Sequence, residues 1–170
     1  MELLIPGLAL VALMVWASTR IKRTAADAFD VEVVETAEFT IRKPAGWLSI
    51  AAPTLPFEAY TKDYAPPPNE EMRLGTATVE TSTEDLDAVA ASLTTGAEVV
   101  EEVREKVGDV HYRVLTLNRL EGEREMVELV KLAEQNGKAY TFRIKALADA
   151  TPESRRDMDG MLDSFELKQL

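Results

Sequence analysis

The sequence predicts an α+β domain, an antiparallel β-sheet flanked by helices, that is preceded by one transmembrane helix. Three observations lead to this fold class. Turn signals at Gly108, Gly122 and Gly137 separate β-rich stretches in the second half of the chain. Two other stretches repeat apolar residues at helical spacing. The run Leu3–Ala17 carries no charge at all.

The uncharged run Leu3–Ala17 is predicted to be a membrane anchor. A helix rises about 1.5 Å per residue, so a hydrocarbon core of about 30 Å calls for roughly 20 residues. The weakly polar residues that follow extend the run, and Arg20, Lys22 and Arg23 can reach the head groups. We therefore expect residues 1–29 to form a transmembrane anchor with a short exit helix.

The charges beside this run predict its orientation. Arg20, Lys22 and Arg23 follow it, whereas only Glu2 precedes it, and positive residues stay on the cytoplasmic side. The prediction is a single-pass protein of the inner (plasma) membrane with a cytoplasmic domain. A cleaved signal peptide is the main alternative, although such signals begin with positive residues. A buried helix is a further alternative.

Composition limits the rest of the chain. With 170 residues, the part after the anchor suits one domain, residues 30–170. The formal charge is −11, and residues 30–170 carry −12 because residues 1–29 hold three basic and two acidic side chains. Such a domain disfavours nucleic acid and suits a partner with a basic face. The chain has no cysteine, which excludes disulfides, thiolate metal sites and a cysteine nucleophile.

The first half of the domain is predicted to hold four strands and a helix. Short β-rich stretches predict the strands, at residues 30–36, 38–43, 57–61 and 74–81, and an extended linker is the alternative for the first of them. Ser82 is predicted to cap the helix, with Asp85 three residues later as a weak capping box. An apolar stripe begins at Leu86, and Gly96 is predicted to end the helix.

The second half is predicted to be an antiparallel meander followed by a helix. Its strands are expected at residues 98–107, 110–117, 126–133 and 139–147, although the valine spacing of the first also fits a helix. The expected strand at residues 126–133 is apolar on both faces, which is typical of a central strand that is covered on both sides. Thr151 and Pro152 begin the last helix. The expected core contains Phe39, Trp47, Tyr140, Phe142, Met161 and Phe165.

Two motifs are candidates for catalytic or metal chemistry. His111 is the only histidine, so a Ser-His-Asp relay would have to use it, but no nucleophile elbow accompanies it. Asp157, Asp159 and Gly160 match part of a calcium loop, yet Arg155 stands where its first carboxylate belongs. We therefore expect an exposed strand histidine and an acidic helix face.

A third candidate is a set of carboxylates. Glu101, Glu102 and Glu105 could approach the acidic stretch 121–128, but paired carboxylates work as acid and base only when burial separates their pKa values. We expect these carboxylates to be solvated. No catalytic, cofactor or metal site is predicted.

The loop Ala65–Glu71 contains three consecutive prolines. Proline cannot donate a ladder hydrogen bond and favours an extended chain, so a surface crossover is one interpretation of this loop. A docking loop is the other. It would present Tyr64 as a rigid aromatic anchor, with Glu70 and Glu71 adding charge toward a basic partner. These three residues are the predicted partner-binding site.

The stretch Phe39-Thr-Ile-x-x-Pro44-x-Gly46-Trp47 resembles the opening strand of PsbP-like domains. These α/β/α sandwiches include the extrinsic PsbP proteins of photosystem II and the nuclear-import factor that binds the Ran GTPase. The ending Met161-Leu-x-Ser164-Phe165-x-Leu167 is similar to the family's terminal helix and last short strand. The resemblance covers about residues 30–168. It implies a largely non-enzymatic protein that binds larger assemblies, and no catalytic residues carry over.

Two functional hypotheses result. The first is a membrane-anchored, non-catalytic interaction module, an accessory or assembly subunit of an inner-membrane protein complex that presents a basic face. The alternative is a membrane-attached hydrolase or small-ligand-binding enzyme that uses carboxylates in a surface cleft. The sparse histidine, the missing cysteine and the missing glycine-rich loop favour the first.

Overall fold

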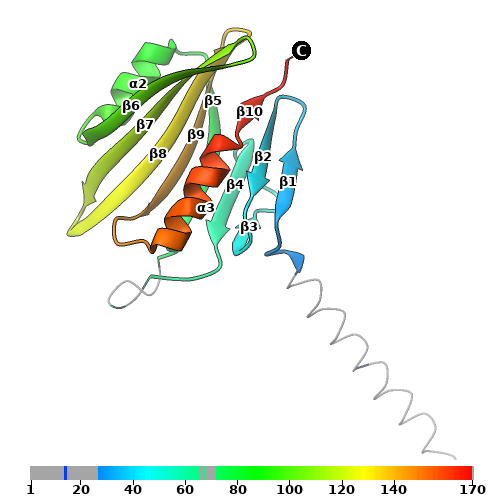
Figure 1. Ribbon diagram of the computed structural model, residues 1–170, viewed down its shortest axis with the longest axis vertical. Helices are drawn as coiled ribbons and strands as arrows, with labels where there is room; N and C mark the ends of the chain where they lie inside the picture. Colours follow the sequence, from blue (N-terminus) through cyan, green and yellow to red (C-terminus); the bar gives the residue numbers. More distant parts are fainter. Residues whose placement is uncertain (1–13, 15–26, 66, 68–71, 170) are drawn as a thin grey trace, which may run out of the picture.

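The computed structural model describes residue 14, residues 27–65, residue 67 and residues 72–169 (Figure 1). The predicted anchor Leu3–Ala17 lies outside the described residues except for Met14, and so do Glu70 and Glu71 of the predicted docking loop. Within the described part of the chain, no helix has both the length and the apolar character needed to cross a membrane.

Antiparallel strands form two sheets. The larger has seven strands in the order β3-β4-β5-β9-β8-β7-β6, and the smaller has three in the order β1-β2-β10. The strands of the larger sheet are β3 Trp47–Ser49, β4 Phe57–Thr61, β5 Gly75–Ser82, β6 Glu98–Val107, β7 Val110–Glu121, β8 Arg124–Gln135 and β9 Lys138–Leu147. Those of the smaller are β1 Glu32–Glu35, β2 Phe39–Lys43 and β10 Glu166–Leu167.

The four consecutive strands β6 to β9 form the predicted meander. Two-residue connections join them, and Gly108, Gly122, Asn136 and Gly137 all have positive φ. Tight hairpin turns need this conformation because it matches the twist of the flanking strands. The stretch 98–107, which was ambiguous between helix and strand, is strand β6.

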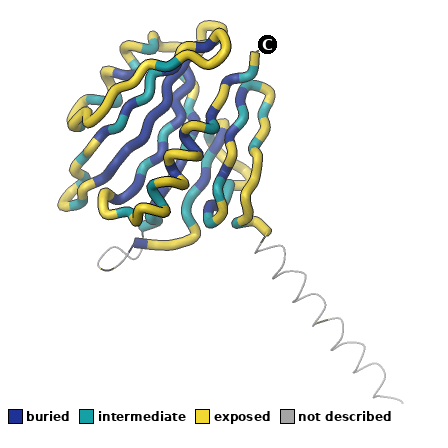
Figure 2. The backbone as a smooth tube through the Cα atoms, in the orientation of Figure 1, coloured by how far each residue is buried: buried dark blue, intermediate teal, exposed yellow. Residues whose placement is uncertain are grey.

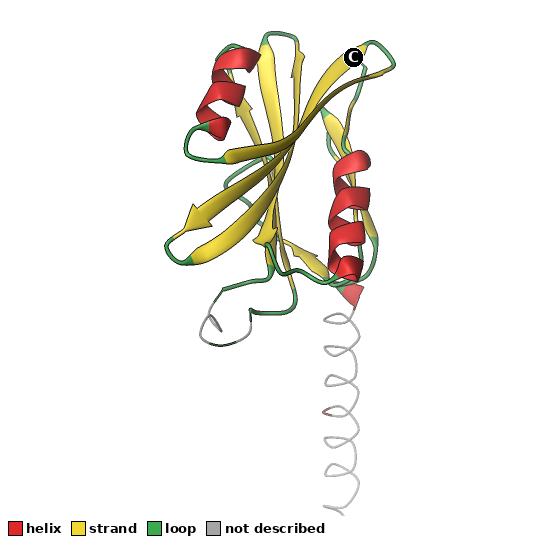
Figure 3. Cartoon of the chain, turned by 60° about the vertical axis from the view of Figure 1, so that its left-hand side comes forward, coloured by secondary structure: helices red, strands yellow, loops and turns green. Residues whose placement is uncertain are grey.

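Helices α2 (Leu86–Thr94) and α3 (Pro152–Asp163) lie on opposite faces of the seven-stranded sheet, as Figure 3 shows. Thr151 caps α3 as predicted, because its hydroxyl accepts the N–H of Ser154 at 3.2 Å. The predicted cap at Ser82 is wrong. Strand β5 continues through Ser82, and Asp85 caps α2 by accepting the N–H of Asp87 at 2.9 Å.

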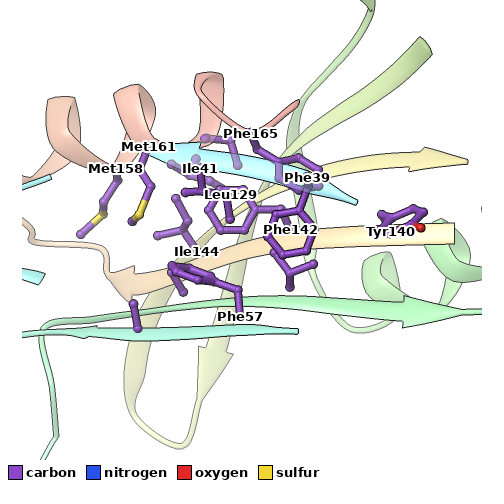
Figure 4. Packing of buried hydrophobic residues seen from close by; sticks show 14 of the residues in the cluster. Phe39, Ile41, Phe57, Leu129, Tyr140, Phe142, Ile144, Met158, Met161 and Phe165 are labelled. Carbon is purple, nitrogen blue, oxygen red and sulfur yellow. The ribbon is translucent and has the colours of Figure 1, made fainter. Parts of the chain in front are cut away.

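The main core lies between the larger sheet and α3. All six predicted core residues are buried, with exposed fractions of 3% or less. Phe165, just after α3, lies at the centre, since its ring centroid is 5.2 Å from that of Phe142 and 5.7 Å from that of Phe39 (Figure 4). Strand β2 of the smaller sheet contributes Phe39 and Ile41 to the same core.

A second, smaller core lies under α2. Leu115 and Leu117 of β7 and Val130 and Leu132 of β8 pack beneath Ala90 of the helix. Strand β8 is therefore covered on both faces, as its sequence predicted, and Figure 2 shows it as a continuous buried stripe. The predicted arrangement of helices on the two faces of an antiparallel sheet is confirmed for the part of the chain that the structure describes.

One buried lysine fixes the point where the chain enters the domain. Lys43, fully buried at the end of β2, donates to the carbonyls of Trp47 at 2.6 Å, Asp30 at 2.8 Å and Ala28 at 3.3 Å. The N–H of Gly46 also donates to the carbonyl of Phe29 at 2.8 Å. These hydrogen bonds hold residues 28–30 against the domain. They also satisfy the buried ammonium of Lys43, whose burial without acceptors would be costly.

Candidate docking surface

The surface of the sheet on the α2 side is only partly covered. Phe142 and Ile144 of β9 point into the α3-side core, so Arg143 and Lys145 point to the other side. The register places Leu48, Tyr60, Thr76 and Lys145 in one row across β3, β4, β5 and β9. We call the α2 side of these four strands the open face. Its side chains are partly or fully exposed except for Ala139, Thr141 and Leu147 of β9.

The triple-proline loop leaves and rejoins this face at a fixed base. Tyr64 and Arg73 pair as an isolated antiparallel bridge, and the N–H of Ala65 donates to the carbonyl of Met72 at 2.7 Å. Ala65 is buried with Met126 and Leu147 in a small apolar cluster. The two ends of the loop are therefore held together by backbone pairing and by packing.

A stacked trio of side chains occupies the loop base. The guanidinium of Arg73 lies 3.8 Å from the ring centroid of Tyr64 and 4.5 Å from that of Tyr60. Nη1 of Arg73 also donates to the carbonyl of Lys62 at 2.7 Å and to that of Thr61 at 3.3 Å. Tyr64 remains 50% exposed. The stack therefore presents a preorganised aromatic surface with an attached positive charge.

Of the predicted partner-binding residues, the structure describes only Tyr64, which is exposed at the loop base. The sequence prediction missed Tyr60 and Arg73. The alternation of β4 contained a usable signal, since Phe57 and Ala59 are buried and Tyr60 must then point outward. No sequence signal identified Arg73, because its position depends on two aromatic rings that meet only in the folded chain.

A charged network lies beside the open face, under the C-terminal end of α2. Glu128 of β8 is 1% exposed, and its Oε1 lies 3.2 Å from Nε of Arg119. Arg119 also donates to the carbonyl of Leu93 at 2.6 Å and to that of Thr95 at 2.9 Å. Arg143 lies 3.8 Å from Oε2 of Glu128. The expectation that the 121–128 carboxylates are solvated is thus wrong for Glu128, which helix α2 and two arginines enclose.

Three of the other candidate carboxylates form ion pairs with bases. Glu105 lies 2.9 Å from Lys131, and Glu102 lies 2.9 Å from Nε of Arg113. Lys145 and Glu121 also form an ion pair. Each of these three carboxylates therefore lies beside a base rather than beside a second carboxylate.

The remaining chemical candidates are at the surface. His111 is exposed on β7 opposite Lys106 of β6, as predicted. Asp157 and Asp159 are exposed on α3, and Asp159 lies 3.8 Å from Nε of Arg155. Over the described ranges, no group of three or more histidine, aspartate and glutamate side chains is placed to hold a metal ion.

The titratable groups with shifted pKa values lie away from the open face. The ammonium of Lys138 donates to Glu38 at 2.9 Å and lowers the pKa of that carboxyl. A hydrogen bond from Lys168 likewise lowers the pKa of Glu35. Burial raises the pKa of Tyr112, whose hydroxyl accepts the N–H of Leu167. These groups join β10 and its neighbours to the rest of the fold.

Comparison with known proteins supports the fold and nothing finer. No protein-family model matches the chain, and no curated protein matches its sequence. The solved structure of LpqN, involved in cell envelope biogenesis of Mycobacterium tuberculosis, is similar with a TM-score of 0.60 at 12% identity, over 82% of this chain and 91% of LpqN.

Two further solved structures are similar. The cyanobacterial PsbP of Synechocystis has a TM-score of 0.54 at 15% identity, over 82% of this chain and 94% of its own. The Ran-binding protein Mog1p of Saccharomyces cerevisiae has a TM-score of 0.54 at 13% identity, over 82% of this chain and 96% of Mog1p. The chain has a PsbP-like fold. The similarity that its strand and helix motifs indicated is thereby confirmed at the level of architecture.

Proposed function

We propose that this protein is a non-catalytic interaction module, held at the inner membrane by Leu3–Ala17, that serves as an accessory or assembly subunit of a membrane protein complex. The single observation that carries the proposal is the stack of Tyr60, Arg73 and Tyr64 on the open face. An exposed aromatic residue on a rigid base loses little entropy on binding, and tyrosine and arginine are frequent binding hot spots.

The charge of the chain supports a partner with a basic face. Residues 30–170 carry −12, and such a field accelerates encounter with a positive surface and weakens as salt screens it. Tyr64 supplies the contact at the centre, supported from behind by Arg73, which the carbonyls of Thr61 and Lys62 bind. Glu70 and Glu71 are proposed to contact basic residues around it.

The entry point of the chain supports a tethered arrangement. Lys43 binds residues 28–30 to the domain, so a helix anchored upstream would restrict how the open face is presented to a neighbouring subunit. The basic cluster of Arg20, Lys22 and Arg23 supports placing the domain in the cytoplasm. Protease added to intact spheroplasts should then leave residues 30–170 uncut, and rapid cleavage there would contradict this orientation.

The docking proposal is tested by co-purification of the full-length chain from detergent-solubilised membranes. Replacing Tyr64, Glu70 and Glu71 with alanine should remove specific partner proteins identified by mass spectrometry. The matched control is Leu120→Ala, because Leu120 is 66% exposed on β7 and lies outside the open face.

Binding by the unsubstituted chain should weaken as salt rises. The control chain Leu120→Ala should bind the same partners with the same salt dependence. Unchanged partners and unchanged salt sensitivity in the triple variant would remove the loop from the proposal. A measurable turnover that disappears in His111→Ala would contradict the non-catalytic function itself.

A further inference from the structure

Strand β6 is an uncovered edge of the larger sheet. It lies at one end of the strand order and pairs only with β7 among the described strands (Figure 1). It has ten residues, whereas β3 at the opposite edge has three. A long edge presents a row of free backbone donors and acceptors that another strand can pair with.

The side chains of β6 are unusually apolar for an exposed edge. Val99, Val100, Val103 and Val107 are 38–55% exposed. Valine favours strands because its branched side chain packs against cross-strand neighbours. Val99, Val103 and Val107 have such neighbours on β7 only, because no strand of the described chain pairs with the other side of β6. An added strand would cover them.

The charges of β6 are divided along its length. The first half contains three acids, Glu98, Glu101 and Glu102, and the second contains two bases, Arg104 and Lys106, with one acid, Glu105. Reversing such a strand places its basic half beside the acidic half of the original. The strand is therefore complementary to its own antiparallel copy, and a two-fold axis repeats each favourable pair.

We propose that two copies of this chain pair through β6, antiparallel and centred on Val103, so that their larger sheets become one continuous sheet. In this register Val103 lies opposite the Val103 of the second copy, and Glu102 lies opposite its Arg104. The proposal concerns self-association and goes beyond the heterologous docking of the open face.

The charged neighbours of this register are compatible with it. Glu101 lies opposite Glu105 of the second copy, but Glu105 is already bound by Lys131 at 2.9 Å within its own chain. Glu102 contacts Arg113 and also lies 3.7 Å from Arg104 of the same chain. A carboxylate has about four acceptor positions, so Glu102 can accept a further bond. Val100 has no partner in the β6–β7 register, and this irregularity limits regular pairing between the two copies to residues 101–105.

The chain lacks cysteine, which permits a direct test with one introduced thiol. Membranes from cells that express the full-length Val103→Cys chain are treated with an oxidant, and the chain is separated on a non-reducing gel. The control is Val33→Cys on edge strand β1, where Val33 is 64% exposed. Opposed cysteines on paired strands come within disulfide range. Most of the Val103→Cys chain should form a disulfide-linked dimer, and little of the control should.

A charge exchange tests the register. In the Val103→Cys chain, Arg104→Glu should slow cross-linking about tenfold, because two symmetry-related pairs change from attraction to repulsion. Adding Glu102→Arg restores opposite charges and should recover the rate to within about threefold. Thermal melting of each variant shows whether loss of the Glu102–Arg113 pair has unfolded it.

Failure of Val103→Cys to cross-link, or equal cross-linking of Val33→Cys, would overturn self-pairing. A cross-linking rate that stays the same in the Arg104→Glu variant would overturn the register. A disulfide to a different protein would show that another occupant covers β6. None of these outcomes alters the co-purification expected from the open face, so the two proposals fail separately.

Discussion

The two faces of the seven-stranded sheet differ in what covers them. On one face, the twelve-residue helix α3 and strand β2 enclose a continuous core that extends from Phe57 to Tyr112. On the other, the nine-residue helix α2 covers only part of β7 and β8, and the uncovered strands carry polar side chains of both charges, among them Glu80, Arg143 and Lys145. Because α2 is short, it leaves part of its face of the sheet exposed, whereas α3 and β2 bury the larger of the two main apolar clusters.

The largest expected effect is on the α3 face. Phe142 is fully buried against Phe165 and Phe57, so Phe142→Ala should lower the free energy of unfolding by about 3–5 kcal/mol. Urea unfolding followed by fluorescence and circular dichroism measures this change. A loss below about 1 kcal/mol would mean that this face does not provide the main core.

A truncation on the α2 face, Leu132→Ala, tests whether the smaller core contributes less stability than the core on the α3 face. Leu132 is fully buried in the smaller cluster, where α2 can move to fill part of the cavity. Leu132→Ala should therefore cost about 2–3 kcal/mol, at the lower end of leucine truncations. The exposed Leu120→Ala serves as control and should change stability by less than about 0.5 kcal/mol. Equal losses for Leu132→Ala and Phe142→Ala would remove the proposed difference between the faces.

The charged network provides a third comparison. Arg119→Met leaves the carboxylate of Glu128 buried without its nearest cation, so it should lower the free energy of unfolding by about 2 kcal/mol. Adding Glu128→Leu removes that charge and should restore most of the loss in the same urea titration. If the double variant is less stable than Arg119→Met, the network stabilises the fold beyond the cost of an unpaired charge.

The smallest expected effect concerns pH. Lys138 lowers the pKa of Glu38, so the pair stabilises the fold at pH values above the usual glutamate value of 4.5. This contribution is lost as pH falls through the lowered pKa of the folded state. Because both side chains are substantially exposed, Glu38→Gln should cost less than about 1 kcal/mol at neutral pH.

The difference between Glu38→Gln and the unsubstituted chain should then shrink below pH 4.5, as measured by urea unfolding across pH. Glu134→Gln is the control, because Glu134 is exposed and forms no ion pair within the described part of the chain. A difference that grows on acidification would contradict the assigned pair.

Features that depend on neighbouring residues could be predicted from the sequence. The turns at Gly108, Gly122 and Gly137 follow from backbone conformations that glycine adopts at little cost. Thr151 and Pro152 fixed the start of α3, and alternation in β9 assigned Tyr140 and Phe142 to the core. The sequence placed Tyr64 at the start of the triple-proline loop, and its side chain is exposed at the base of that loop.

Tertiary structure alone decided the features that join distant segments. Glu128 and Lys43 are polar in sequence yet buried, because Arg119 and three backbone carbonyls meet them only after folding. The stack of Arg73 between Tyr60 and Tyr64 depends on strand β4 and the end of the loop coming together. Local periodicity specifies which side of a strand is apolar, but which helix covers that side, and how far, depends on contacts between residues far apart in the chain.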